Sequence, residues 1–195
     1  MASLRAAQKQ MTRQLLLDRG LELFEAKGYA ATTVDDIAAA AGTTRATFYL
    51  HFPSKAELMR SLVETTNDLL TRPDVPPLPD VVRSGDREQI RTWLGRKFDQ
   101  WSVIRPYVVA AHQAAASEPD IQASLDQWFE SAIGDIVDGL NSADRFDPAS
   151  RRIRGALAFG QLEFYSRRWF QFGWIDDRDL SLTVMTDSWC SLLTE

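Results

Sequence analysis

Two short helical segments that meet at a glycine, within residues 33–52, constrain this chain more than any other feature. Thr33 is followed three residues later by Asp36, a spacing that predicts a capped helix running to about residue 41. Gly42 can then adopt the left-handed backbone conformation that a tight turn requires. A second helix is expected directly after this glycine, so the region predicts a helix-turn-helix.

The second helical segment has its own start signal and an inward face. Thr43 or Thr44 can cap it, and its Phe48 and Phe52 are spaced to pack over Ile37 of the first segment. The remaining side chains of this segment are mostly hydrogen-bond donors. They are therefore candidates for an exposed surface that contacts a polar partner.

These exposed polar residues form a candidate DNA-binding surface. Residues near the start of a helix in the major groove contact base edges, so Arg45 is the candidate for guanine and Thr47 for thymine. Side chains further along the helix suit phosphate contacts, as does the helix N-terminus at Thr33. The alternative is a pair of ordinary capped helices with solvated side chains. The full candidate set comprises Thr33, Thr43, Thr44, Arg45, Thr47, Tyr49, His51 and Lys55.

The run Gly42–Lys55 resembles the DNA-binding domain of TetR-family transcriptional regulators, and residues 26–38 match the same family. The resemblance extends over about residues 11–62. Thr43 departs from the more usual apolar residue, and Ala46 stands where glycine or another small residue is frequent. The resemblance implies an all-α fold, in which a three-helix helix-turn-helix domain precedes a larger helical domain for effector binding and dimerisation.

The charge distribution agrees with a local DNA-binding surface. The chain has a net charge of −5, yet residues 1–60 hold eight Lys and Arg against six Asp and Glu, a net of +2. The acidic excess therefore lies in the remainder. The N-terminal basic residues can form an arm that reaches DNA, or they can be a solvated terminus. The expected basic patch comprises Arg5, Lys9, Arg13, Arg45 and Lys55.

Composition also limits the other classes of protein. The 195 residues are 45% hydrophobic and 25% charged, as in ordinary globular proteins. No apolar run approaches the roughly 20 residues of a membrane span, and the N-terminus lacks the apolar core of a signal peptide. The single Cys190 cannot form an internal disulfide. We therefore expect a cytoplasmic protein without metal or cofactor, in which Cys190 is either an inert buried thiol or a reactive one.

Helical periodicity continues to the end of the chain, and strand signals are absent. The prolines of residues 71–85 predict a loop that no regular helix crosses. We expect a DNA-binding domain with its N-terminal arm at 1–60 and an effector-binding and dimerisation domain at 61–195. Outside the two motif helices, the expected helices span about 11–27, 55–70, 87–104, 106–116, 117–139, 147–172 and 177–193.

All six tryptophans lie at or after residue 93, where they can fill a core or line an apolar cavity. Trp93, Lys97 and Trp101 share one helix face. His112 and Gln113 interrupt an apolar stretch, and Glu163 interrupts another, where Arg167 can pair with it. Given the TetR resemblance, we expect a largely apolar effector. Its candidate contacts are Trp93, Lys97, Trp101, His112, Gln113, Trp128 and Glu163.

The segment 149–172 is apolar on nearly every side, which predicts a helix buried on all faces. In a domain of this size, one of those faces is expected to meet a second copy of the chain. TetR-family dimers pair their last two long helices, which the resemblance extends to this chain. The candidate interface residues are Phe164, Trp169, Val184 and Trp189.

These observations favour a homodimeric regulator that binds a palindromic operator in double-stranded DNA, most simply a repressor released by a small ligand. A constitutive DNA-binding or architectural protein without an effector is the alternative. An enzyme that uses His112 and Glu163 lacks support, because the sequence has two histidines, no metal-ligand spacing, no nucleophile motif and no phosphate-binding glycine loop.

Overall fold

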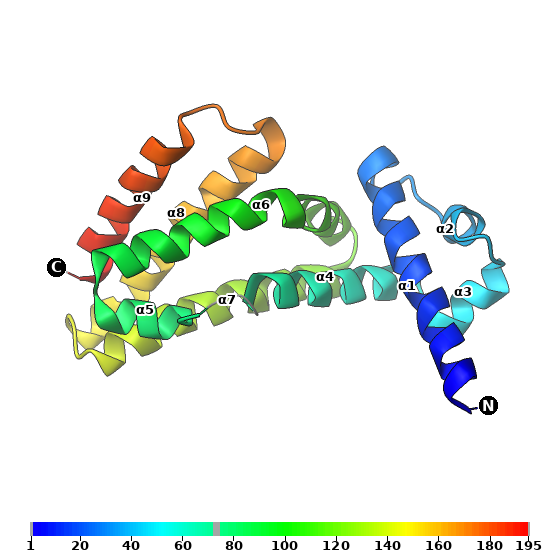
Figure 1. Cartoon of the computed structure of the whole chain (residues 1–195), viewed down its shortest axis with the longest axis horizontal. Coiled ribbons are helices and arrows are strands. Elements are labelled where there is room, and N and C mark those ends of the chain that lie inside the picture. The colour runs from blue at the N-terminus through cyan, green and yellow to red at the C-terminus, as the bar shows by residue number, and fades with distance from the viewer. Residues whose placement is uncertain (1, 72–74, 195) are drawn as a thin grey trace. The chain divides into compact units, whose positions relative to one another are not determined.

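The computed structural model describes residues 2–71 and 75–194, and every regular element in that part of the chain is a helix (Figure 1). The predicted all-α class is therefore confirmed. The helices, in chain order, are α1 (Ala2–Lys27), α2 (Val34–Ala40), α3 (Arg45–His51), α4 (Lys55–Thr71), α5 (Leu78–Ser84), α6 (Arg87–Ala115), α7 (Pro119–Ser142), α8 (Pro148–Phe172) and α9 (Arg178–Leu193).

By its internal contacts the chain divides into two compact units. The first unit comprises Met1–Asp68 and Ile104–Leu125, and the second comprises Leu69–Val103 and Asp126–Glu195. The end of α6 and the start of α7 therefore pack with the N-terminal helices. The predicted division into a DNA-binding domain at 1–60 and an effector-binding and dimerisation domain at 61–195 remains a prediction.

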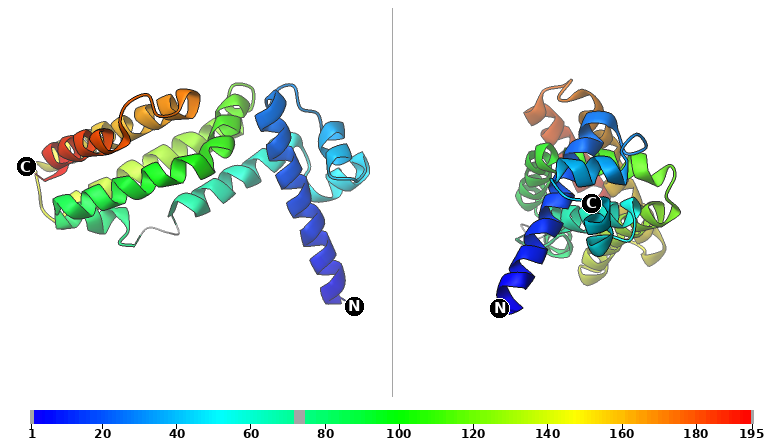
Figure 2. Two further views of the ribbon diagram at one scale, coloured as in Figure 1. Left: turned by 45° about the horizontal axis from the view of Figure 1, so that its top comes forward. Right: turned by 90° about the vertical axis from the view of Figure 1, so that its right-hand side faces the viewer.

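The core of the first unit is built from apolar side chains of α1 to α4 and of the segment 104–125. Phe24, Ile37, Phe48 and Phe52 are almost completely buried in it, as the sequence pattern predicted for the last three. Figure 2 shows α2 and α3 beside α1, whose N-terminal end extends beyond them. The helix begins at residue 2 rather than at about residue 11.

The local signals of the helix-turn-helix are confirmed. Thr33 caps α2 and forms a reciprocal capping box with Asp36, and the salt-bridging Lys27 lowers the pKa of Asp36, as do the hydrogen bonds from Thr33. Gly42 has a φ of 64°, the left-handed conformation that a side chain would strain. Thr44, rather than Thr43, caps α3 and accepts a hydrogen bond from the Thr47 N–H.

Proline positions caused two errors in the predicted helix limits. Pro106 lies inside one continuous α6 instead of opening a new helix. The predicted loop 71–85 contains α5, because Pro79 lies in the first turn, where no N–H is needed. Pro73 of that loop lies outside the described residues. The prolines and caps at the starts of α7, α8 and α9 agree with the predicted starts to within about two residues.

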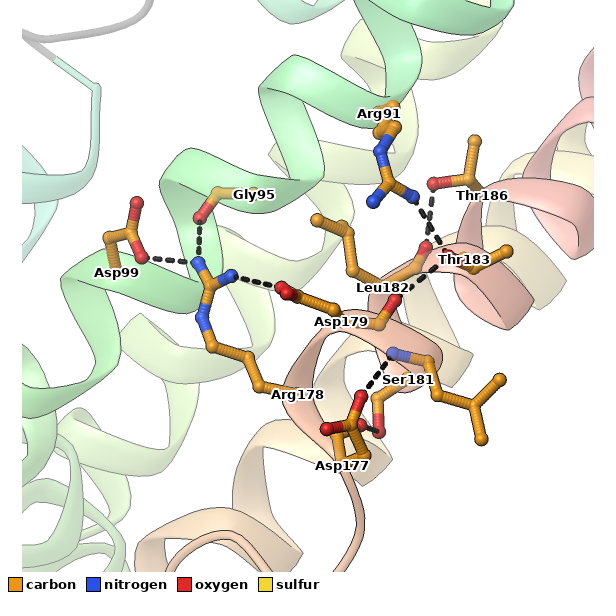
Figure 3. A network of polar contacts seen from close by, with 11 residues as sticks. Arg91, Gly95, Asp99, Asp177, Arg178, Asp179, Ser181, Leu182, Thr183 and Thr186 are labelled. Carbon is orange, nitrogen blue, oxygen red and sulfur yellow. Dashed lines mark hydrogen bonds and ion pairs between the residues drawn. The ribbon is translucent and has the colours of Figure 1, made fainter.

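In the second unit, a series of polar contacts joins the first half of α6 to α9 (Figure 3). Arg91 donates to the Thr183 hydroxyl at 3.0 Å, and Arg178 pairs with Asp99 and Asp179. Trp93 of α6 also stacks on Trp189 of α9, with the ring centroids 5.5 Å apart. Helices α8 and α9 also lie against each other (Figure 1), so α9 contacts both.

Among the described residues, no helix has both the length and the apolarity that crossing a membrane requires.

Candidate nucleic-acid interface

Helix α3 presents one exposed face, because its other face packs Phe48 into the core of the first unit. Arg45, Tyr49 and Leu50 are exposed, and Leu50 is the most exposed of the three at 76%. A seven-residue helix with Phe48 in the core on one side and a guanidinium on the other has the form of a DNA-reading element.

The Arg45 side chain is oriented by two neighbours. Its Nη1 donates to Asp35 of α2 at 2.7 Å, and its Nη2 donates to the Tyr49 hydroxyl at 3.3 Å. The guanidinium also lies over the Tyr49 ring, with Cζ 5.6 Å from the centroid. Arg45 and Asp35 are both about 60% exposed, so this pair is available to exchange partners with a ligand.

The threonines near the two caps are close to the helix N-termini. The exposed hydroxyl of Thr33 donates to Asp36 at 2.7 Å, and the hydroxyls of Thr44 and Thr47 lie 3.0 Å apart. Thr43 is half-buried. The hydroxyls of Thr33, Thr44 and Thr47 therefore each have an intramolecular partner at the N-terminal end of α2 or α3.

His51 lies at the C-terminal end of α3, and its Nδ1 is buried without a hydrogen-bond partner among the described atoms. Burial lowers the pKa of this imidazole, and the positive charges of Lys9 and Arg13 on α1 lower it further. The ring is therefore neutral at pH 7, and two basic residues of α1 are its neighbours. Arg13 is itself fixed by a 2.8 Å hydrogen bond to Ser61.

Lys55 is held by contacts within the first unit. Its ammonium donates to the backbone oxygens of Tyr29 at 2.7 Å and Thr32 at 2.8 Å, and it lies 4.1 Å from the centroid of the Tyr29 ring. Burial lowers the pKa of Lys55. This amine satisfies the turn between α1 and α2, so it is not a free phosphate-binding group.

The predicted effector residues belong to both compact units. His112 and Gln113 belong to the first unit, where Gln113 accepts a hydrogen bond from the Tyr29 N–H at 2.9 Å. Lys97 is buried in the second unit, where its ammonium donates to the Leu70 oxygen and lies 4.7 Å from the Trp93 ring. The predicted effector residues therefore come from both compact units, and their assignment remains a prediction.

The tryptophans of the second unit contact other rings in three groups. Trp93 stacks on Trp189, and Trp128 packs edge-on against Phe159 at 5.3 Å. The largest group surrounds Trp101, which is stacked on Trp174 at 5.4 Å. Its other members are Phe98, Tyr165, Trp169 and Phe170.

Several polar atoms within these aromatic groups lack a partner. Among the described residues, the indole N–H groups of Trp93, Trp169 and Trp189 are buried without an acceptor. Such donors are rare in folded proteins. Glu163 has the expected partner, Arg167, at 3.4 Å, and burial raises the pKa of the Glu163 carboxyl while that arginine partly opposes the shift.

The predicted dimer residues divide between the surface and the core. Phe164 of α8 and Val184 of α9 are 66% and 61% exposed. Trp169 is half-buried. Trp189 is completely buried against Trp93 within its own chain, so it has no surface that a second copy can cover. Cys190, next to it, is half-buried.

Sequence reasoning missed two kinds of functional neighbour. Asp35, which pairs with Arg45, is ten residues away in sequence; the spacing of two helices across a turn was the available signal. Gln113 and Glu118, which bond Tyr29, are more than 80 residues away. Nothing in a single sequence indicates that pairing.

Comparison with known proteins bears on this geometry. The family model described as bacterial regulatory proteins of the tetR family matches residues 16–62. The HTH-type transcriptional repressor DhaR of Mycobacterium sp. (strain GP1) is 35% identical over 147 residues, which cover 58% of this chain and 73% of DhaR. The chain belongs to the TetR family. Its class is that of DNA-binding transcriptional regulators rather than enzymes.

Other curated TetR-family matches are shorter. Three HTH-type regulators from Pseudomonas and Bacillus are 27% to 37% identical, and the chain spans only 37%, 58% and 34% of their lengths. These matches cover 40%, 40% and 50% of this chain.

Solved structures share the whole TetR-family fold. A TetR-like transcriptional regulator from Rhodococcus sp. RHA1 aligns with a TM-score of 0.68 at 20% identity, over 94% of this chain and 97% of that chain. SmeT, in its complex with triclosan, aligns with a TM-score of 0.68 at 21% identity over 91% of both chains. At such identities the likeness establishes the fold alone.

Proposed function

We propose that this TetR-family protein is a repressor that reads a palindromic operator with α3 and is released from it by a small, largely apolar ligand. The observation that carries the proposal is the exposed face of α3, where Asp35 and Tyr49 hold the Arg45 guanidinium in an accessible position. Arginine in this position can bind the O6 and N7 atoms of guanine with two parallel hydrogen bonds.

The other residues of the surface have roles that follow from their positions. Thr47, one turn from the start of α3, contacts a thymine methyl group or a base edge. Tyr49, His51 and the caps Thr33 and Thr44 contact phosphates, which fixes the register of the helix without reading sequence. Thr43 lies beside the α3 cap and joins this group. Lys55 is excluded because its donors serve the backbone of the first unit.

A palindromic operator requires two copies of the reading helix. The exposed apolar side chains of α8 and α9, which include Ile153, Leu157, Phe164, Leu180 and Val184, supply a face that a second copy can cover. Two-fold symmetry then presents two α3 helices at a separation of about 34–36 Å, one turn of B-DNA.

The proposed effector site is in the second unit. Three buried indole N–H groups without an acceptor favour a ligand that combines aromatic or aliphatic surface with a hydrogen-bond acceptor. SmeT, which shares this fold, was solved in complex with triclosan, and this supports a proposed ligand of that chemical kind. A ligand shifts the protein between its DNA-binding and released forms only by its difference in affinity for the two.

The reading role of Arg45 is tested with the duplex that the wild-type protein enriches from a random library. Arg45→Ala is expected to reduce binding to this duplex by about 5- to 150-fold for each reading helix, the ~1–3 kcal/mol of a bidentate base contact. Binding to a random duplex should change much less. The matched control is Arg83→Ala, which removes an exposed arginine of α5 in the second unit. If Arg45→Ala retained the wild-type preference while folded, the assignment of α3 would be wrong.

A further inference from the structure

The turn between α1 and α2 is bonded by two residues that lie far away in the sequence. The backbone N–H of Tyr29 donates to Oε1 of Gln113 at 2.9 Å, and the Tyr29 hydroxyl donates to the Glu118 carboxylate at 2.9 Å. Gln113 lies in the last turn of α6, and Glu118 directly precedes α7. All three residues belong to the first unit, so these contacts lie within one compact body.

Tyr29 is well suited to serve as a fixed point. Its side chain is 1% exposed, and its ring packs against Phe24 at 5.1 Å with the ammonium of Lys55 over it. Burial raises the pKa of the Tyr29 hydroxyl, and the bond to Glu118 raises it further. The hydroxyl therefore remains a donor at physiological pH, and a buried phenol requires an acceptor such as this carboxylate.

We propose that Gln113 and Glu118 are positioning residues for operator recognition, acting through Tyr29. This inference rests on the proposed function of α3. Neither residue belongs to α3. The Gln113 side chain is exposed, and its Oε1 accepts a hydrogen bond from the Tyr29 N–H. Their contribution is to hold the α1–α2 turn in one conformation.

The path from this turn to the base contact is short. The turn ends at Thr32, whose oxygen Lys55 binds, and the next residue, Thr33, caps α2. Helix α2 carries Asp35, which orients Arg45. A turn free to change conformation would move the α2 cap and Asp35, and the Arg45 fork would lose its fixed orientation.

The expected effect follows from the cost of ordering a loosened element when DNA binds. One net hydrogen bond is worth about 1 kcal/mol, which corresponds to about fivefold in affinity for each reading helix. A two-fold dimer contains the contact twice, so each single substitution is expected to weaken operator binding by about 25-fold. Non-specific binding depends on charge, and it is expected to change by less than about twofold.

The test uses the full chain and two conservative substitutions that leave its charge unchanged. Tyr29→Phe removes the donor to Glu118, and Gln113→Met removes the acceptor of the Tyr29 N–H. The matched controls are Tyr107→Phe, which removes a half-buried hydroxyl in the same unit, and Gln89→Met, which replaces an exposed glutamine near the other end of α6. Gln113→Glu restores an acceptor and serves as the rescue variant.

The measured quantity is the ratio of affinities for the duplex enriched by the wild-type protein and for a random duplex of equal length. Tyr29→Phe and Gln113→Met should lower this ratio by about an order of magnitude or more, and Gln113→Glu should restore most of it. Hydrogen exchange provides an independent readout: the Tyr29 amide should exchange faster in Gln113→Met than in Gln113→Glu.

Two failures are distinguishable. If the wild-type protein has no sequence preference, the proposed function of α3 fails. If the wild-type protein is selective and both Tyr29→Phe and Gln113→Met keep its full ratio, the positioning role is overturned while the proposed function stands. Should Tyr29→Phe unfold the chain, Gln113→Met still decides, because the Gln113 side chain is exposed and outside the core.

Discussion

At the scale of single residues, Asp35 and Tyr49 hold the Arg45 side chain in the free protein. A base that binds Arg45 must therefore replace one of these partners. Asp35 is exposed, as is Arg45, so the ion pair itself contributes little to stability. A guanine edge offers two acceptors in the plane that the guanidinium prefers. We infer that Asp35 orients the arginine and is then replaced by the base.

The exchange at Arg45 is tested by Asp35→Asn. Removing the carboxylate takes a negative charge from the DNA-facing surface, so affinity for a random duplex should rise by a few-fold. Preference for the selected duplex should fall, because Arg45 is no longer oriented. Titrations of both duplexes at one salt concentration provide the measurement. A variant that binds both duplexes as the wild type does would show that Asp35 is irrelevant to recognition.

Glu163 gives a prediction about pH. Because burial raises its folded-state pKa, the folded chain binds this proton more strongly than the unfolded chain does. Stability is therefore lost as pH rises through the interval between the ordinary and the raised pKa. Glu163→Gln should unfold at a higher urea concentration than the wild type at pH 7, and the difference should disappear below about pH 4.

The opposite change in the stability of Glu163→Gln would also be informative. A less stable Glu163→Gln at pH 7 would mean that the ion pair with Arg167 outweighs the cost of burying the carboxylate. Urea titrations of both proteins at pH 7 and pH 4 separate these cases, since shared acid effects cancel in the difference.

Residue-level prediction succeeded where the partner was local. The Thr33–Asp36 box, the left-handed Gly42 and the Glu163–Arg167 pair all join residues at most four positions apart, or concern one residue alone. Lys55 and Gln113 have intramolecular partners that the sequence did not indicate. Both contact Tyr29, which lies 26 residues from Lys55 and 84 residues from Gln113 in the sequence. Only the packed fold brings these residues together.

At the scale of helices, α8 and α9 combine a buried side with an exposed apolar one. Phe159, Leu162 and Phe170 are buried, whereas Ile153, Leu157 and Phe164 are exposed on α8. Exposed apolar side chains that share a helix face are typical of an interaction surface. The apolar character of 149–172 predicted this helix, but only the fold separates its inner face from its outer one.

The proposed dimer face is tested by Phe164→Asp and Val184→Asp. Both side chains are exposed in the single chain, so the charged variants should fold normally. The dissociation constant of the dimer should rise by two orders of magnitude or more, as expected from a cost of about 3 kcal/mol per dimer. Analytical ultracentrifugation measures the change. The matched control is Gln171→Asp, which adds the same charge at an exposed position near the C-terminal end of α8. Arg152→Asp is less suitable, because it also breaks the ion pair with Glu130. Unchanged association in both charged variants would rule out this face.

Helix limits were predictable where capping residues dominate and unpredictable where proline is tolerated. Asp147 and Asp177 cap α8 and α9 as expected. Pro106 did not end α6, because buried residues on both sides of it, Ile104 and Ala110 among them, hold the helix in place. Packing compensates for the one hydrogen bond that proline removes.

At the scale of the whole molecule, the two compact units divide the work proposed for this protein. The first unit contains the net positive N-terminal segment and α3, and the second contains all six tryptophans. Helix α6 contributes to both, because it is continuous from Arg87 to Ala115. The sequence predicted two domains, each one continuous stretch of chain. The segment Ile104–Leu125 instead packs with the N-terminal helices, which a division at a single residue cannot describe.

The central claim is that the chain binds DNA as a sequence-specific dimer. The most direct measurement is selection of duplexes from a genome-derived library by the purified wild-type protein at moderate salt, followed by sequencing. We expect enrichment of a palindrome whose half-sites are about one helical turn apart, roughly 10 base pairs. Salt-sensitive binding without any enriched sequence would contradict it.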